Sequence, residues 1–428
     1  MIDPNVIAQL PKVELHDHLD GGLRPATIVE LAEKIGYQLP TTDPDKLEQW
    51  FYDAANSGDL PTYLTTFDHT TAVMQTEESL VRVTREAVED LAADNVVYAE
   101  LRYAPEQHLS EGLSLQQVVD ATVQGVKEGE RLVAERGGQI HVRLILCAMR
   151  HADRSAEIAQ LTADNYGPHS PGEGYVVGFD IAGAEFGFPP SKHAEAFQIL
   201  RENLVPFTIH GGEADGVESL KDALGQGARR IGHGVRVYED FEATMSGIEL
   251  GPVARFMRDQ QILLEVCPTS NTQTGVCDTI ADHPFNLLYD MGFNLSINTD
   301  NRLVSGTTMT QEYVRLAEDF DFEYWQFLEF TTNALDAAWA DQDLKQHLLR
   351  EVIYPAFAEL GLGESAEDED ADDQHAHTHS HVSHGLKGLH GAPALGEEDV
   401  ELSMETLKAE LETLGLSLDD DAESDEDK

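Results

Sequence analysis

The segment Pro11–Pro25 reads PKVELHDHLDGGLRP and decides between two fold classes for this chain. It begins with a short apolar run, Lys12–His16, which has the length expected of a buried strand. An open doubly wound sheet usually carries a glycine-rich phosphate loop after its first strand, whereas Leu15–Gly22 reads LHDHLDGG and lacks one. The segment therefore favours a closed barrel over an open sheet.

Seven similar apolar runs follow, and longer stretches with helical spacing separate them. Most of these runs are continuously apolar, as expected for parallel strands that are buried on both faces. Strands that alternate with helices eight times predict an α/β fold, a (β/α)8 TIM barrel with extra helices. The predicted strands are Lys12–His16, Val96–Tyr103, His141–Ala148, Val176–Ile181, Pro206–His210, Ile231–His233, Ile262–Val266 and Asn294–Asn298. The clearest predicted helices are Ala26–Ile35, Glu78–Asp94, Leu115–Arg136 and Lys192–Asn203.

The composition of the chain changes near Gly361, which predicts two parts. Residues 1–360 are expected to form the barrel domain. Residues 361–428 contain an acidic run, Glu364–Asp373, and then a stretch rich in His, Gly and Ser. We expect this acidic, histidine-containing tail to be mostly disordered, with room for one short helix over 397–414.

The charge of the chain limits its partners. The formal net charge is -51, of which residues 361–428 contribute -18 and residues 1–360 contribute -33. A phosphate backbone or an anionic membrane surface would repel such a chain, so we expect no nucleic acid and no membrane partner. The acidity fits either a salt-rich habitat or an ordinary acidic enzyme. Three cysteines and the lack of a secretory signal or an apolar span predict a cytoplasmic protein.

Histidines and carboxylates fall at the ends of four predicted strands. His16 and His18 end the first strand, His210 ends the fifth and is followed by Glu213, His233 ends the sixth, and Asp300 follows the eighth. In a (β/α)8 barrel the carboxyl ends of all strands meet on one face, where active sites form. We therefore expect these side chains to lie together.

The residue types indicate zinc. Imidazole nitrogens and a carboxylate oxygen are donors that Zn²⁺ accepts, and an H-x-H pair on a strand directs both side chains to one face. Arg102 could form a buried ion pair or line the pocket, and we favour the buried ion pair. Other histidines, among them His283, show no clustering.

Five segments together resemble one known family, the adenosine deaminases of the metal-dependent amidohydrolase superfamily. The segments occur in the family's order and span the chain from about Pro11 to about Ala338. They are PKVELHDHLDGGLRP (Pro11–Pro25), HGGEADG (His210–Gly216), RIGHGVR (Arg230–Arg236), CPTSN (Cys267–Asn271) and SINTDN (Ser296–Asn301).

The resemblance implies a role for each candidate residue. The metal ligands would be His16, His18, His210 and Asp300. Some members of the superfamily bind two metals through a lysine at the end of the fourth strand, whereas the fourth run here ends in DIAGAE (Asp180–Glu185) without a lysine, so the resemblance implies one Zn²⁺ per chain. Glu213 would be the general acid toward purine N1, while water activated by zinc attacks C6 and His233 assists as base or electrostatic partner. Substrate contacts would come from His18, Asp20, Gly183 and Asn301.

The implied function is hydrolytic deamination of adenosine, and of 2'-deoxyadenosine, to inosine or deoxyinosine and ammonia. The partner would thus be a small purine nucleoside. Asn301 departs from the family, which has an aspartate facing purine N7, and an amide NH₂ can donate to that nitrogen directly. Two alternatives remain open: a deaminase of adenine, an N6-substituted adenosine or aminodeoxyfutalosine, and a non-catalytic metal-binding protein.

Overall fold

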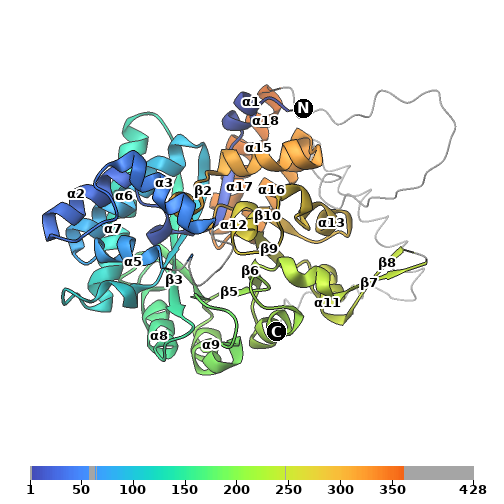
Figure 1. The fold of residues 1–428 in the computed structure, drawn as a ribbon, viewed down its shortest axis with the longest axis horizontal. Helices are drawn as coiled ribbons and strands as arrows, with labels where there is room; N and C mark the ends of the chain where they lie inside the picture. Colours follow the sequence, from blue (N-terminus) through green and yellow to red (C-terminus); the bar gives the residue numbers. More distant parts are fainter. Residues whose placement is uncertain (1, 57–62, 64, 246, 361–428) are drawn as a thin grey trace, which may run out of the picture. The chain divides into compact units, whose positions relative to one another are not determined.

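Eight parallel strands form the centre of the described chain, as the apolar runs predict (Figure 1). The structure is a computed structural model that describes residues 2–56, 63, 65–245 and 247–360. The predicted tail and its helix over 397–414 lie outside the described residues. The parallel strands are β1 (Lys12–His18), β2 (Val96–Tyr103), β3 (His141–Met149), β4 (Val176–Ala182), β5 (Thr208–Gly211), β6 (Arg230–His233), β9 (Leu263–Val266) and β10 (Leu295–Ile297).

The strands close into a barrel. Regular pairing joins them into two four-stranded sheets, in the orders β1-β2-β3-β4 and β10-β9-β6-β5. Two parallel bridges join these sheets, one between Phe179 and Phe207 and one between Asp17 and Asp300. At the second bridge the amide of His18 donates to the carbonyl of Asp300 at 2.7 Å, and the amide of Asp300 donates to the carbonyl of His16 at 2.8 Å. The predicted (β/α)8 barrel is therefore confirmed.

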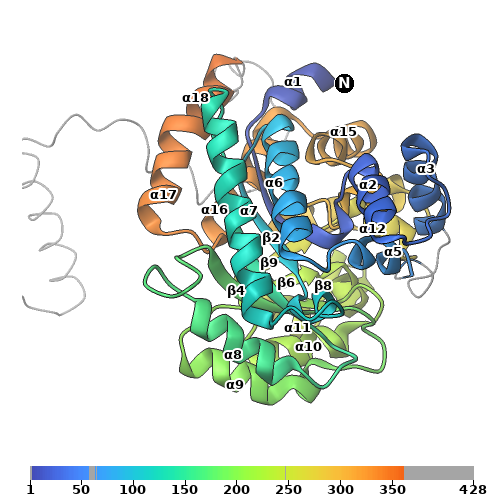
Figure 2. The same cartoon turned by 90° about the vertical axis from the view of Figure 1, so that its left-hand side faces the viewer.

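Helices surround the strands, and their starts follow from local capping chemistry (Figure 1). Thr76 and Ser79 form a capping box at the start of α6, and Ser114 caps α7 through the amide of Gln117. Figure 2 shows α6 beside α7 and α8 beside α9, as their mutual contacts require. The helices are α1 (Pro4–Gln9), α2 (Pro25–Ile35), α3 (Pro44–Ala55), α5 (Phe67–Ala72), α6 (Glu77–Ala93), α7 (Leu115–Glu135), α8 (Ser155–Asn165), α9 (Ala194–Glu202), α10 (Val217–Gln226), α11 (Pro252–Asp259), α12 (Pro268–Gln273), α13 (Phe285–Asp290), α14 (Arg302–Ser305), α15 (Met309–Phe320), α16 (Tyr324–Ala337), α17 (Gln342–His347) and α18 (Tyr354–Glu359).

The core explains why the strands are continuously apolar. Every residue of β2 is buried, and so is every residue of β4. One face of each strand packs inside the barrel and the other packs against helices, and burying one large aliphatic side chain contributes about 1.5–3 kcal/mol.

One element is absent from the sequence prediction. Phe241–Thr244 (β7) and Gly247–Leu250 (β8) form an antiparallel hairpin before α11. Most of its side chains are exposed or half-buried, so the pattern of a buried strand is missing. Within the described ranges, no helix combines the length and the apolar character needed to cross a bilayer.

Candidate metal centre and active site

Four predicted ligands converge at the carboxyl ends of the strands. One donor atom from each of His16, His18, His210 and Asp300 lies within 4.8 Å of all the others. The Nε2 atoms of His18 and His210 are 3.2 Å apart, and Asp300 Oδ1 lies 3.4 Å from His16 Nε2. Three imidazole nitrogens and one carboxylate oxygen thus face a common point, which is the arrangement that a single cation requires.

The backbone holds two of these residues in an uncommon conformation. His233 has φ of 61° and Asp300 has φ of 63°. Both values lie in the left-handed region, which residues other than glycine rarely adopt. Each follows or ends a barrel strand, where this turn directs the side chain over the mouth of the barrel. Such strain persists where the surrounding structure enforces it, and it is concentrated at functional sites.

Two of the three ligand imidazoles, those of His16 and His210, contact a buried carboxylate through Nδ1, the ring nitrogen that faces away from the ligand cluster. Glu265 Oε2 accepts from His16 Nδ1 at 3.0 Å, and Asp180 Oδ2 lies 2.8 Å from His210 Nδ1. When Nδ1 of His16 carries the proton, its Nε2 lone pair faces the ligand cluster. Burial, followed by the charge of Arg102, lowers the pKa of His16 to about 4, so the ring is neutral at pH 7.

Arg102 joins the two carboxylates. Its Nη1 donates to Asp180 Oδ2 at 2.6 Å and its Nη2 donates to Glu265 Oε2 at 2.7 Å, with all three side chains fully buried. Burial alone would raise the pKa of Glu265, but Arg102 and Arg230 hold it well below its usual range. The predicted buried ion pair of Arg102 is thus confirmed, and it lies directly behind two ligands.

Replacing Arg102 with Met should destabilise the fold by about 3–5 kcal/mol, because two buried carboxylates would lose their shared cation. Lys in place of Arg102 should give an intermediate value, since an ammonium lacks the planar fork that reaches both partners. Urea unfolding measures the effect. The matched control is Arg131→Met, which breaks the exposed pair with Glu135 and should cost at most about 1 kcal/mol. Equal stability of the two Met variants would contradict the prediction.

Glu213 and His233 form a second cluster with Asp300. One donor atom of each lies within 4.8 Å of the others, and His233 Nε2 is 3.7 Å from Glu213 Oε2. Glu213 is buried, and this burial raises its pKa, while the neighbouring His233 acts in the opposite direction. A carboxyl group with a raised pKa retains a proton that it can donate.

A hydrogen-bond chain fixes which nitrogen of His233 carries its proton. The amide of Phe285 donates to His283 Nδ1 at 3.0 Å, so neutral His283 carries its proton on Nε2. That nitrogen lies 3.2 Å from Asn271 Oδ1, and Asn271 Nδ2 lies 3.1 Å from His233 Nδ1. The side-chain amide of Asn271 therefore donates to Nδ1 of His233, and neutral His233 carries its proton on Nε2, which faces Glu213.

The predicted substrate residues lie at or just after the ends of barrel strands: His18 ends β1, Asp20 lies in the short 3-10 helix Leu19–Gly21, and Gly183 and Asn301 follow β4 and β10. Asp20 is buried, and burial raises its pKa to about 7. One Asn301 contact differs from the expected use of its amide, because Nδ2 donates to the hydroxyl of Tyr63 at 2.8 Å. The Oδ1 atoms of Asp20 and Asn301 are buried without a partner among the described residues. Gly183 directly follows β4 and has φ of 97°.

The sequence prediction omitted several residues behind the site. Asp180 and Glu265 are charges inside apolar runs, and this signal could have identified them, because buried charges are nearly always paired. His283 and Tyr63 have no comparable local signal.

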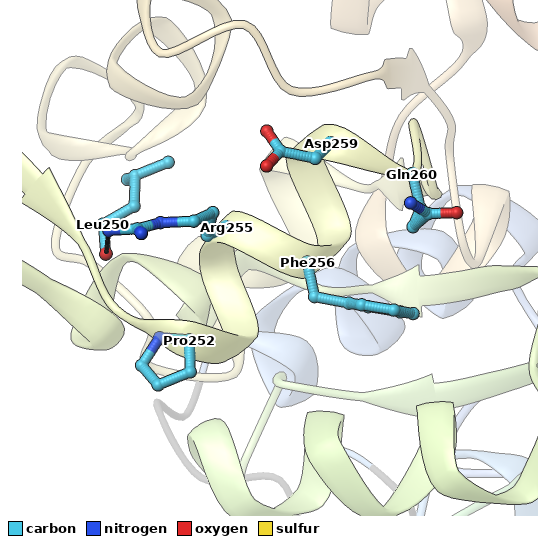
Figure 3. Close-up of a pocket in the computed structure, with 6 residues that line it drawn as sticks. All are labelled: Leu250, Pro252, Arg255, Phe256, Asp259 and Gln260. Carbon is cyan, nitrogen blue, oxygen red and sulfur yellow. Dashed lines mark hydrogen bonds between the residues drawn. The ribbon is translucent and has the colours of Figure 1, made fainter.

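A surface hollow of about 460 Å³ on α11 contains none of the site residues (Figure 3). It is lined by Leu250, Pro252, Arg255, Phe256, Asp259 and Gln260.

Comparison with known proteins agrees with this geometry. The family model described as adenosine deaminase matches residues 11–355. Adenosine deaminase 1 of Streptomyces coelicolor is 51% identical over 360 residues, which cover 83% of this chain and 89% of the relative. The structure of adenine deaminase from Arthrobacter aurescens has 27% identity and a TM-score of 0.68, and covers 82% of this chain and 99% of its own. The N6-mAMP deaminase of Arabidopsis has 27% identity and a TM-score of 0.69, and covers 81% of this chain and 98% of its own. Because the family model spans most of the described barrel and a relative is 51% identical over 83% of the chain, the chain belongs to the adenosine deaminase family of hydrolytic deaminases.

Proposed function

We propose that this enzyme uses one Zn²⁺ to deaminate adenosine and 2'-deoxyadenosine hydrolytically. The observation that carries the proposal is the convergence of the four donor atoms beside Glu213 and His233. The donor set fits zinc, because three imidazoles and a carboxylate match its ligand preference. The buried Nε2 of His16 also has no hydrogen-bond partner among the described residues. When bound, the metal would supply Lewis acidity that activates water near neutral pH.

Glu213 would act as the general acid. Addition of water to C6 of a purine breaks the aromaticity of the ring, and protonation of N1 removes much of this resistance. Burial favours the protonated form of Glu213, so the side chain can hold a proton and transfer it to N1 as the attack proceeds. The carboxylate left on Glu213 would then take one proton from the attacking water and pass it to the departing amino group, which leaves as ammonia. It would take the second proton as the C6 hydroxyl becomes a carbonyl, and this step restores the protonated acid.

His233 would act as an electrostatic partner rather than as a base in its neutral form. The chain from Phe285 through His283 and Asn271 occupies Nδ1 and leaves a proton on Nε2. This N–H can donate to the oxygen that attacks C6 and stabilise the charge that develops there. Of the two roles implied by the sequence, the hydrogen-bond chain favours this one.

The substrate residues support a nucleoside. The unpartnered oxygen of Asp20 can accept a hydrogen bond from a ribose hydroxyl, and the backbone of Gly183 can meet the purine ring. The hydroxyl of Tyr63 can donate as well as accept. With its amide turned over, Asn301 would accept from Tyr63 through Oδ1 and donate to N7 through Nδ2.

Ammonia release from a substrate panel tests this proposal. We expect adenosine and 2'-deoxyadenosine to have the highest kcat/KM, with adenine lower by about 10²-fold or more, because the bare base leaves Asp20 unpaired. Adenine, an N6-substituted adenosine or aminodeoxyfutalosine as the best substrate would favour the rival deaminase activities instead.

A deletion tests the rival of a different class, a non-catalytic metal-binding protein. We propose that the protein acts in the cytoplasm. We also propose that residues 1–360 form the catalytic domain. A chain that ends at Leu360 should then keep the adenosine kcat of the full chain. The metal-binding alternative would be supported if the full chain deaminates no aminopurine and the shortened chain loses its bound zinc.

A further inference from the structure

One buried carboxylate, that of Glu185, accepts five hydrogen bonds from the segment that carries Glu213. Its Oε1 accepts from the amide of Gly212 at 2.8 Å and from the hydroxyl of Ser219 at 2.6 Å. Its Oε2 accepts from the amides of Glu213, Ala214 and Asp215 at 3.1, 2.7 and 2.9 Å. Glu185 is only 2% exposed, so water has little access to these bonds.

The backbone of the segment is shaped to surround this carboxylate. Four successive amides can point at one anion only when the chain turns through a left-handed residue, and Gly212 has φ of 69°. A side chain at this position would also place its Cβ 2.8 Å from Leu220 Cδ2. The segment thus forms an anion-binding nest, and Glu185 supplies the anion from within the protein.

The nest fixes the acid relative to the metal ligands. Its first amide belongs to Gly212, two residues after the ligand His210, and its second belongs to Glu213 itself. On the other side of this residue, Arg236 Nε donates to the carbonyl of Glu213 at 2.7 Å. Hydrogen bonds therefore hold both peptide groups of Glu213.

We propose that Glu185 is a positioning residue that holds Glu213 at the distance from the purine that proton transfer requires. Glu185 lies two residues after Gly183, so one short loop would set both the position of the purine ring and the position of its acid. The inference rests on the proposed function of Glu213. It assigns to Glu185 no contact with substrate or metal.

Glu185→Gln isolates this role, because it keeps the shape of the side chain and replaces one acceptor oxygen with an NH₂ group. The hydrogens of that group would face backbone amides that are themselves donors. We expect kcat for adenosine to fall by about 10–100-fold, since a small displacement of a reacting group has a large effect on rate. KM and the content of one zinc per chain should stay near wild type. Glu185→Asp retains both oxygens on a shorter arm, so its kcat should lie between those of the wild type and the Gln variant.

Amide hydrogen exchange supplies a readout that does not depend on catalysis. The amides of residues 212–215 should exchange faster in Glu185→Gln, whereas amides in the barrel strands should keep their protection. The matched control is Glu218→Gln on the exposed first turn of α10, where kcat and exchange should equal those of the wild type.

Three results would overturn the inference. They are wild-type kcat in Glu185→Gln, unchanged protection of residues 212–215, and a loss of kcat that is explained by lost zinc. If Glu185→Gln does not fold, Glu185→Asp decides alone, and wild-type kcat in that variant counts against the inference. A wild-type enzyme that releases no ammonia from adenosine would refute the proposed function, while the exchange experiment would still decide whether Glu185 holds the segment.

Discussion

Glu213→Gln should lower kcat for adenosine by about 10²–10⁴-fold, the usual contribution of a positioned general acid, and should leave one zinc per chain. The amide of Gln has nearly the volume of the carboxyl group, so the pocket keeps its shape. It has no proton of suitable acidity for N1, and therefore the addition of water to the ring stays uphill. Steady-state kinetics and metal analysis of the same sample measure both quantities.

The pH dependence of the wild type gives the same prediction a second test. A general acid works only while it is protonated, and burial raises the pKa of Glu213. Activity should therefore be present below that raised pKa and decline as the pH rises through it. Glu218→Gln is the control for the substitution itself, because Glu218 is exposed on α10. Wild-type kcat in Glu213→Gln would exclude Glu213 as the acid.

Removal of the metal should abolish ammonia release, and addition of Zn²⁺ should restore it. The donors of His16, His18, His210 and Asp300 converge within 4.8 Å, and without a cation they would leave buried polar atoms facing one another. Bound metal also stabilises the folded state, by about 2.7 kcal/mol when its free concentration is 100 times its Kd. Dialysis against a chelator, followed by activity and thermal unfolding measurements, gives both results.

His16→Ala is the control for this experiment. It removes one ligand from the centre and keeps every histidine of residues 361–428, so metal held by those histidines would be equal in both proteins. The variant should bind less zinc by one ion per chain and should regain no activity on addition of Zn²⁺. Full activity after exhaustive metal removal would refute the proposed chemistry.

Most strands were predictable because a parallel barrel buries both faces of each strand. β2 is the clearest case, since Val96–Tyr103 matches the prediction and all of its residues are buried. β5 begins at Thr208 rather than at the predicted Pro206. Phe207, just before it, forms only an isolated bridge with Phe179 of β4. The β7–β8 hairpin could not be predicted in this way, because a largely exposed hairpin has no buried face to mark it in the sequence.

The candidate site was predictable where strand ends set it, and unpredictable where loops and long-range contacts set it. A barrel requires His16 and Asp300 to lie on one face, whatever the intervening sequence. His283, in contrast, reaches His233 only through Asn271, and this path depends on how α12 and α13 pack. The five bonds to Glu185 likewise depend on a loop conformation that no periodic pattern encodes.

At the seam between β1 and the residues after β10, the closure of the barrel and the assembly of the candidate metal site involve the same residues. The backbone bonds that close the barrel there belong to His16, His18 and Asp300, which are themselves predicted ligands. During synthesis, the first strand must keep an open edge until almost the whole barrel has left the ribosome, and an open edge invites pairing with other chains. Zinc bound across this seam would therefore indicate that the edge of β1 is paired and can no longer pair with another chain.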